Sequence, residues 1–173
     1  MKKILAFSGS NSSVSINQRF IHIVAKLIEG IDVIDLRDYD APIYSQDIEA
    51  ATGLPEKISQ LYDLIQGYDS IVIALPEHNG LPTAFLKNIL DWLSRNKGQK
   101  FLQDKKVILL STSPGGNGGA SALAKIQKVI PYWGATVVGT HSLGSFFDKV
   151  DTDNNLNSKE DQTAIETIFE TLK

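Results

Sequence analysis

Five short apolar runs, separated by amphipathic segments of helix length, constrain the fold of this chain more than any other feature. The expected strands are residues 3–8, 32–36, 70–75, 106–112 and 136–143. The cores of the third and fourth runs are continuously apolar, which is typical of strands covered on both faces. The expected helices are residues 16–29, 55–66, 83–96, 120–132 and 158–172. Five such units in succession predict an α/β fold, a doubly wound five-stranded parallel sheet with helices on both faces.

Residues with known positional preferences mark the ends of these helices. Ser15 and Gln18 have the spacing of a capping box, which predicts that the first helix begins at Ile16. Other residues of this kind stand at further expected ends and support the same division of the chain. They are Gly30, Pro55, Gly67 and Ser158 with Asp161.

Length and composition limit the number of domains and the classes of partner. A chain of 173 residues with 42% hydrophobic content can bury one α/β core, so residues 1–173 are expected to form a single domain. The net charge of -3 and the lack of a Lys/Arg cluster argue against binding to nucleic acid or to an anionic membrane. No apolar stretch approaches the roughly 20 residues of a membrane span. We therefore expect a cytoplasmic protein.

The residue types that commonly bind metals give no metal-site pattern. The chain has no cysteine, which excludes disulfides and thiolate sites. Its three histidines, His22, His78 and His141, lie far apart and lack metal-ligand spacing. We expect no metal site.

The loop after the first expected strand is rich in hydroxyl and amide side chains. It runs from Ser8 to Asn17, where a strand gives way to a helix. The first turn of a helix has unpartnered N–H groups and the positive end of the helix dipole, so it can hold an anion. Ser10, Ser15 and Asn17 would add neutral donors around a phosphate. The alternative is that these side chains only end the strand and cap the helix.

Two further loops fall on the same edge of the expected sheet, where open parallel sheets bind their ligands. The loop 76–82 has a proline at each end and a glycine between them, which gives a stiff backbone that can face a flat heteroaromatic ring. The loop 113–119 contains four glycines, so its main chain can approach a ligand without Cβ atoms in the way. Alone, such a turn is also typical of a flexible connection. Three unusual loops on one edge favour a ligand site.

In this order, the three segments resemble the motifs of the NADPH-dependent FMN reductase family, a flavodoxin-like group that includes azoreductases, quinone reductases and chromate reductases. The first loop is similar to the family's phosphate loop. Residues 76–80, followed by Leu-Lys-Asn at 86–88 and Asp-Trp at 91–92, are similar to its Pro-x-Tyr-Asn segment and the helix after it. Residues 113–119 occupy the place of its flavin loop. The resemblance runs from residue 2 to about residue 147 and implies the flavodoxin-like strand order 2-1-3-4-5.

The resemblance implies that FMN is the cofactor and that NADPH or NADH is the electron donor. The phosphate would lie in the first loop, and the isoalloxazine would lie along the second loop with its other edge against the third. No catalytic residue is implied. The cofactor-binding residues implied are Ser8, Ser10, Ser15, Ile16, Asn17, Pro76, Glu77, His78, Asn79, Gly80, Ser113, Pro114, Gly115, Gly116 and Gly119.

Two positions depart from the family pattern. Ser12 stands where many relatives have an arginine, so a bidentate charge partner for the phosphate is missing. His78 stands in place of a frequent tyrosine, and its imidazole can still lie against a ring or donate to a carbonyl. Both departures predict looser flavin binding.

Three pairs of neighbouring residues each allow two interpretations. Glu77 and His78 suggest an acid–base pair, although adjacent side chains usually diverge. Lys87 and Asp91, one helical turn apart, predict either a solvated ion pair or part of a dimer interface. The pair at 146–147, both phenylalanine, predicts either internal packing or a wall of a substrate site.

We therefore expect an NAD(P)H-dependent oxidoreductase in which hydride passes from nicotinamide to FMN and then to a quinone, azo compound, flavin or similar small-molecule acceptor. The family resemblance implies a homodimer or homotetramer. We place the long connection 37–52 near the flavin or a dimer partner. Two alternatives are a flavodoxin-type single-electron carrier and a phosphate-ligand regulatory module that has lost flavin. Carriers are usually strongly acidic and cover the flavin with aromatic side chains, whereas residues 113–119 contain no aromatic residue.

Overall fold

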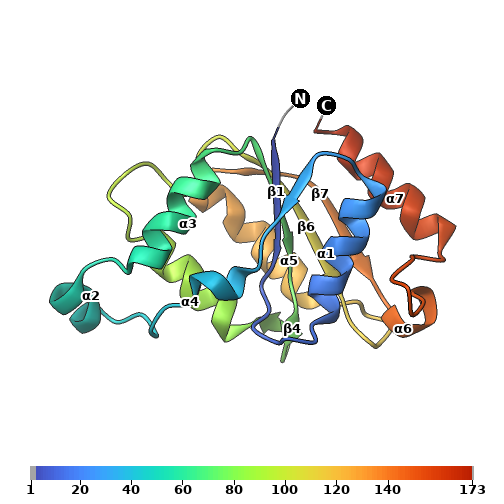
Figure 1. Ribbon diagram of the computed structural model, residues 1–173, viewed down its shortest axis with the longest axis horizontal. Helices are drawn as coiled ribbons and strands as arrows, with labels where there is room; N and C mark the ends of the chain where they lie inside the picture. The colour runs from blue at the N-terminus through green and yellow to red at the C-terminus, as the bar shows by residue number, and fades with distance from the viewer. Residues whose placement is uncertain (1–2, 173) are drawn as a thin grey trace.

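A five-stranded parallel sheet forms the centre of the computed structural model, which describes residues 3–172. The strands follow the order β2-β1-β3-β6-β7 (Figure 1), and each neighbouring pair is parallel. This arrangement confirms the predicted fold class and the order 2-1-3-4-5, counted over the strands of this sheet. The five strands are β1 (Ile4–Ser8), β2 (Ile31–Val33), β3 (Ser70–Ala74), β6 (Lys106–Thr112) and β7 (Thr136–Leu143).

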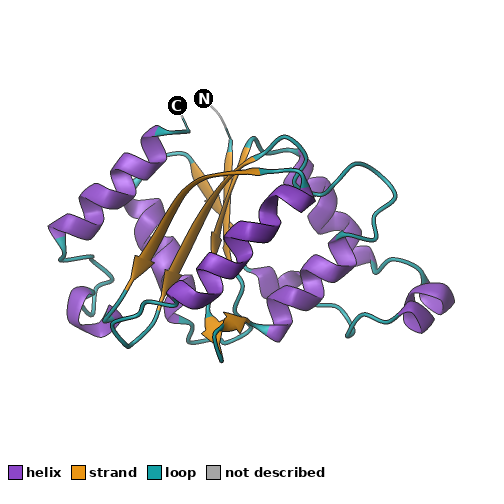
Figure 2. Ribbon diagram, turned by 180° about the vertical axis from the view of Figure 1, so that it is seen from behind, coloured by secondary structure: helices purple, strands orange, loops and turns teal. Residues whose placement is uncertain are grey.

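Helices cover both faces of the sheet, as Figure 2 shows from behind. One face carries α3 (Glu56–Gln66), α4 (Ala84–Leu93) and α5 (Ala120–Val129). The other face carries α1 (Ile16–Leu27), α6 (Phe146–Lys149) and α7 (Lys159–Glu170). Within residues 3–172, none of the helices has the length and apolar character needed to cross a lipid bilayer.

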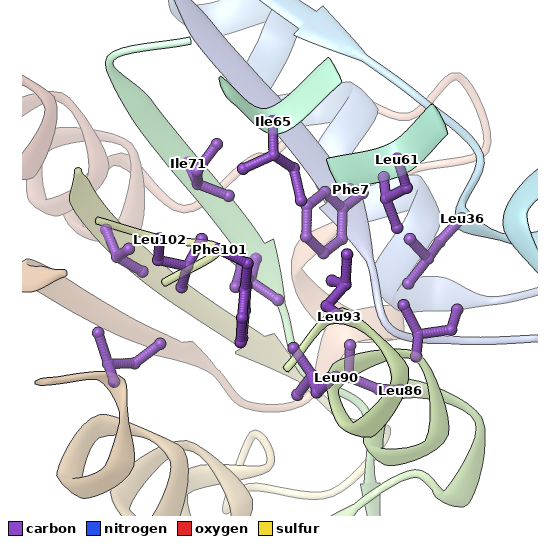
Figure 3. Close-up of a cluster of buried hydrophobic side chains, with 14 of the residues drawn as sticks. Phe7, Leu36, Leu61, Ile65, Ile71, Leu86, Leu90, Leu93, Phe101 and Leu102 are labelled. Atoms are coloured by element: carbon purple, nitrogen blue, oxygen red, sulfur yellow. The ribbon is translucent and has the colours of Figure 1, made fainter. Parts of the chain in front are cut away.

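Two hydrophobic cores, one on each face, explain why the strands are continuously apolar. Successive side chains of a strand point to opposite faces, so Leu5 and Phe7 of β1 enter one core while Ile4 and Ala6 enter the other. Figure 3 shows the ring of Phe7 among side chains of α3 and α4. An alternating pattern would have left one face polar and exposed. The sequence signal for a doubly covered sheet therefore has a direct structural cause.

Most element boundaries agree with the sequence-based expectation, and the exceptions have local causes. β6 and β7 have the expected bounds. β2 ends at Val33 instead of residue 36, and the chain turns into the 3-10 helix η1 (Leu36–Tyr39), because the Asp35 side chain accepts from the N–H of Arg37. α5 ends at Val129 and continues as the 3-10 helix η2 (Ile130–Trp133), since Pro131 has no N–H to extend the α-helical ladder.

Besides η1, four elements were not expected from the sequence. A hairpin of β4 (Glu77–His78) and β5 (Leu81–Pro82) forms in the loop after β3. The four-residue helix α6 follows β7. Within the connection 37–52, α2 (Gln46–Thr52) begins where the Ser45 hydroxyl accepts from the N–H of Ile48. No residue of α2 is buried, and the helix stands away from the body of the molecule (Figure 1).

Candidate functional site

The three loops identified in the sequence meet at the carboxyl edge of the sheet, the lower edge in Figure 1. The N–H of Gly9 donates to the carbonyl of Ala74 at 2.9 Å, which joins the first loop to the end of β3. The Thr83 hydroxyl donates to the carbonyl of Gly9 and also caps α4. A Cβ atom on Gly9 would lie 2.6 Å from Leu86 Cδ2, so only glycine lets this loop approach α4 so closely.

The first loop ends at an open helix terminus. Ser15 caps α1 by accepting from the N–H of Gln18 at 3.2 Å, which confirms the helix start at Ile16 and one half of the predicted capping box. The Gln18 side chain lies near His22 and, within residues 3–172, does not return the bond to the Ser15 N–H. The N–H groups of Ile16 and Asn17 have no hydrogen-bond partner within residues 3–172, and the first turn contains no acidic side chain. The Ser8 hydroxyl, at the end of β1, is buried without a partner in the same range. Such groups are expected where an anion is held.

Asn17 has a structural task that the sequence did not reveal. Its side chain is only 4% exposed. Its Nδ2 donates to the carbonyl of Thr112 at 3.0 Å, and its Oδ1 accepts from the N–H of Thr112 at 3.1 Å. Asn17 thus joins the start of α1 to the end of β6 through its side chain. Its backbone N–H, which has no partner within residues 3–172, remains available to a ligand.

The second loop is a tight hairpin whose turn is Asn79-Gly80. Both residues have positive φ, 54° for Asn79 and 74° for Gly80, as a two-residue type I′ turn requires. The Asn-Gly pair is the sequence signal that could have predicted this hairpin. The Glu77 carboxylate accepts from the N–H of Ala122 at 2.9 Å, whereas His78 is exposed. The two side chains therefore diverge, and an acid–base pair is not formed.

The third loop is ordered by hydrogen bonds and divides its glycines between two tasks. Its carbonyls at Ser113 and Gly115 accept from N–H groups in the segment after β7, at 3.1 and 2.9 Å. Gly119 has a φ of 79°, and a Cβ there would lie 2.0 Å from Ser111 Oγ. A Cβ on Gly115 or Gly116 would meet nothing within 4 Å. Gly119 thus permits packing, while Gly115 and Gly116 leave main chain exposed.

Residues outside the expected list also build this edge. Ser111 donates its hydroxyl to the carbonyl of Leu75 at 2.7 Å, which fixes the exit from β3. Gly144, after β7, packs so tightly that a Cβ would lie 2.2 Å from the carbonyl oxygen of Gly116. Thr83, directly before a helix, carried an N-cap signal, but nothing in the sequence around Ser111 or Gly144 indicated these contacts.

The fifteen residues expected to bind FMN are all located at this edge or in the elements that lead to it. Ser8, Ser15, Asn17, Pro76 and Gly119 are buried. The other ten are partly or fully exposed and are Ser10, Ile16, Glu77, His78, Asn79, Gly80, Ser113, Pro114, Gly115 and Gly116. The exposed group offers surface that a ligand would contact. Of the buried group, Ser8 and Asn17 carry unpartnered donors, and Ser15, Pro76 and Gly119 fix the shape of the edge.

The paired aromatic residues and the charged helix pair have simple environments. Phe146 is fully buried in the core under α6, whereas Phe147 is 62% exposed, so packing accounts for only the first of the two. Lys87 Nζ lies 2.6 Å from Asp91 Oδ1 in an exposed ion pair. Trp92, beside Asp91, is buried and donates its indole N–H to the carbonyl of Pro42 at 2.7 Å.

Three partly or fully buried ionisable side chains join β7, α6 and α7. His141 Nε2 of β7 is 3.0 Å from Asp161 Oδ1 of α7, and Lys149 Nζ is 2.8 Å from Asp161 Oδ2. Burial lowers the pKa of His141, because desolvation outweighs the attraction of Asp161. Burial pushes the pKa of Asp161 upward, but the hydrogen bond from Lys149 helps to hold it below its usual value. Among the described residues, no group of three or more His, Cys, Asp or Glu side chains could hold a metal ion.

A doubly wound parallel sheet with an open helix terminus, a rigid hairpin and exposed glycine main chain at its carboxyl edge defines a flavodoxin-like nucleotide-binding protein. The residues at this edge fit FMN, because unpartnered N–H groups at the start of α1 can bind a phosphate and the main chain of Gly115 and Gly116 is exposed. The sequence model of the NADPH-dependent FMN reductase family matches residues 2–148, and the chain belongs to that family. It is therefore an NAD(P)H-dependent FMN oxidoreductase, with FMN as cofactor and NADPH or NADH as electron donor. The family predicted from the sequence is confirmed.

Two sequence relatives agree with this assignment, and a solved structure shares the fold. A 2-hydroxy-1,4-benzoquinone reductase from a Burkholderia species is 28% identical over 171 residues, which are 97% of this chain and 92% of that protein. An NAD(P)H-dependent FMN reductase from Pseudomonas aeruginosa is 30% identical over 131 residues, covering 75% of this chain and 70% of that protein. The solved structure of a flavoenzyme NAD(P)H:(acceptor) oxidoreductase from Paracoccus denitrificans has a TM-score of 0.80 at 24% identity, over 98% of this chain and 96% of that chain.

Proposed function

We propose that FMN binds with its phosphate at the first turn of α1 and its isoalloxazine between the β4–β5 hairpin and the loop 113–119. The reducing equivalents of NAD(P)H would then pass to a quinone or a related small-molecule acceptor. One observation carries this proposal: the first turn of α1 has unpartnered N–H groups at Ile16 and Asn17 and no acidic side chain. A phosphate there gains both hydrogen bonds and the favourable end of the helix dipole.

The residues of the chain hold and orient the cofactor, and none is required as an acid or base. Bound FMN supplies the redox chemistry, since its ring can take a hydride from nicotinamide and pass reducing equivalents on. The N–H groups of Gly115 and Gly116 have no partner within residues 3–172. Donors fixed in this way stabilise negative charge that develops on a neighbouring ring edge. His78 and Asn79, on the rigid turn, would border the ring from the other side.

The choice of a quinone-class acceptor is supported by relatives named quinone reductase. One such protein from Escherichia coli is 33% identical over 99 residues, although these make up only 52% of its length. The purified protein should oxidise NAD(P)H in the presence of FMN and a benzoquinone. Rapid mixing with NAD(P)H should bleach the absorption of bound flavin. Bound flavin that stays oxidised would favour the single-electron carrier instead, and a protein that never retains FMN would favour the flavin-free module.

Ser8 offers a direct test of the phosphate site. Its hydroxyl has no partner in the described part of the chain, so Ser8→Ala should leave the melting temperature unchanged. Its affinity for FMN should fall about tenfold, which corresponds to one lost hydrogen bond to a charged group. Ser70 is the matched control, because its hydroxyl is equally buried and unpartnered but lies at the opposite edge of the sheet. Equal FMN affinity of Ser8→Ala and wild type would remove Ser8 from the site.

We further propose that residues 1–173 act as one cytoplasmic FMN-binding domain that assembles as a homodimer or homotetramer. The exposed helix α2 and the exposed side chain of Ile43 before it offer surface for a second copy. Light scattering of the purified protein should give two or four times the mass of one 19.0 kDa chain. A monomer at micromolar concentration would contradict this assembly.

A further inference from the structure

The β4–β5 hairpin is too small to hold its own shape. Each of its strands has two residues, and an isolated two-stranded ribbon is marginal in water even when it is longer. In the protein, both ends of the hairpin are fixed to the sheet edge. The N–H of Leu75 donates to the carbonyl of Leu110 at 2.8 Å, and the hydroxyl of Thr83 donates to the carbonyl of Gly9. The turn itself projects beyond these anchors and needs support of its own.

Helix α5 supplies that support through two polar contacts. The Glu77 carboxylate, at the start of the hairpin, accepts from the N–H of Ala122 at 2.9 Å. The Lys125 ammonium donates to the carbonyl of Gly80 in the turn. Ala122 contributes its backbone N–H in the first turn of α5, and Lys125 contributes its side chain one turn further along. The first two turns of α5 thus contact the hairpin at its first residue and in its turn.

The contact of Glu77 also completes α5. The N-cap residue Gly119 has no side chain to cap the helix, and the first turn of α5 contains no acidic residue. Glu77 supplies from outside the helix the negative charge that usually stabilises a helix N-terminus. The contact is therefore a charge-assisted hydrogen bond, which is stronger than a neutral one.

We propose that Glu77 and Lys125 are positioning residues that hold the hairpin in one conformation against the flavin ring. This inference rests on the proposed FMN site. The side chains of His78 and Asn79, which the hairpin carries toward the ring, have no hydrogen-bond partner within residues 3–172. Their position is set by the backbone alone. A loosened hairpin would have to be ordered each time the ring binds, and that ordering would weaken affinity.

The test compares Glu77→Ala and Lys125→Met with wild type. Amide hydrogen exchange of residues 76–82 in the flavin-free protein should become about tenfold faster in both variants. The dissociation constants for FMN and for riboflavin should rise by the same factor, about tenfold, because the hairpin faces the ring and not the phosphate. Glu77→Gln, which keeps an acceptor oxygen, should recover most of the affinity. Lys128→Met, on the same helix and equally exposed, should resemble wild type in both measurements.

Separate outcomes test the inference and the proposed function. Lys125 is exposed, so its substitution leaves the core intact. If amide hydrogen exchange of residues 76–82 were as slow in Lys125→Met as in wild type, the inference would be overturned whether or not FMN binds. Faster exchange with unchanged affinity for FMN and riboflavin would also overturn it, because the hairpin would then not touch the ring. A variant weakened for FMN but not for riboflavin would assign these residues to the phosphate instead. If wild type bound neither flavin, the proposed function would fail and the positioning role would fail with it.

Discussion

Replacing Asn17 with aspartate separates the structural task of this residue from its place beside the phosphate. In wild type, Asn17 both donates to and accepts from the backbone of Thr112, at 3.0 and 3.1 Å, while only 4% exposed. The introduced carboxylate would keep one acceptor oxygen but would place its second oxygen against the carbonyl of Thr112. Leaving that carbonyl unsatisfied costs about 1–3 kcal/mol, and burying the carboxylate adds to this. We therefore expect a loss of about 2–4 kcal/mol in the free energy of unfolding at pH 8.

The loss should depend on pH in a defined direction. Burial favours the protonated carboxyl, so the folded-state pKa of the introduced side chain should lie above its unfolded value of about 3.9. The protonated form can donate to Thr112 and restore the missing bond. The stability of the variant should therefore be greatest below the unfolded pKa and should fall as the pH rises through the folded-state pKa. The deficit relative to wild type should be smaller at pH 5 than at pH 8.

Thermal unfolding of the flavin-free protein measures this effect without a contribution from ligand binding. For a chain of this size, 1 kcal/mol corresponds to about 2–4 °C, so the variant should melt about 5–15 °C below wild type at pH 8. Asn11→Asp is the control, because it adds the same charge at an exposed position of the same loop. It should keep the wild-type melting temperature. An unshifted Asn17→Asp would refute the bridge to β6, and unchanged FMN affinity would refute a phosphate at the start of α1.

Three further substitutions test other parts of the structure. Gly119→Ala should lower the free energy of unfolding, measured by urea titration, by more than about 2 kcal/mol. The introduced Cβ would lie 2.0 Å from Ser111 Oγ, and the backbone φ of 79° is unfavourable for alanine. A variant as stable as wild type would contradict that packing. Lys149→Met should cost about 1 kcal/mol at pH 7. That loss of stability should disappear as the pH falls through the lowered pKa of Asp161, because a protonated carboxyl no longer attracts the ammonium of Lys149. A loss that is the same at every pH would show that the Lys149–Asp161 ion pair does not cause it. Trp92→Phe removes the indole bond to the segment before α2, so limited proteolysis should cut residues 40–53 faster than in wild type, with cutting elsewhere unchanged.

The sequence predicted the elements that depend on local pattern and failed where distant contacts decide. β6 and β7 were placed to the residue because charged, polar or glycine residues bound their apolar runs clearly. The short edge strand β2 was predicted in the right place but with its end three residues too late, because the Asp35 side chain starts η1 instead. The hairpin was missed although its Asn-Gly turn was visible in the sequence. α2 was missed because a helix with no buried residue has no apolar face to reveal it.

The residues of the candidate site show the same division. Glycine content marked loop 113–119 as a place where main chain is exposed, but only the contacts show that Gly119 packs while Gly116 faces open space. The amide of Asn17 was recognised as polar and well placed, yet its partner Thr112 lies 95 residues away. Neither distinction is encoded within a few residues of the position concerned.

The sequence by itself determined the doubly wound sheet, the capped start of α1 and the edge at which a phosphate-bearing cofactor is expected. These follow from hydrophobic periodicity and from helix-end chemistry, both of which act over a few residues. Only the tertiary structure decided that Glu77 caps α5, that Lys125 supports the turn at Gly80 and that Asn17 spans to β6. Such contacts join segments far apart in the chain, and they exist only after packing of the two cores has brought those segments together.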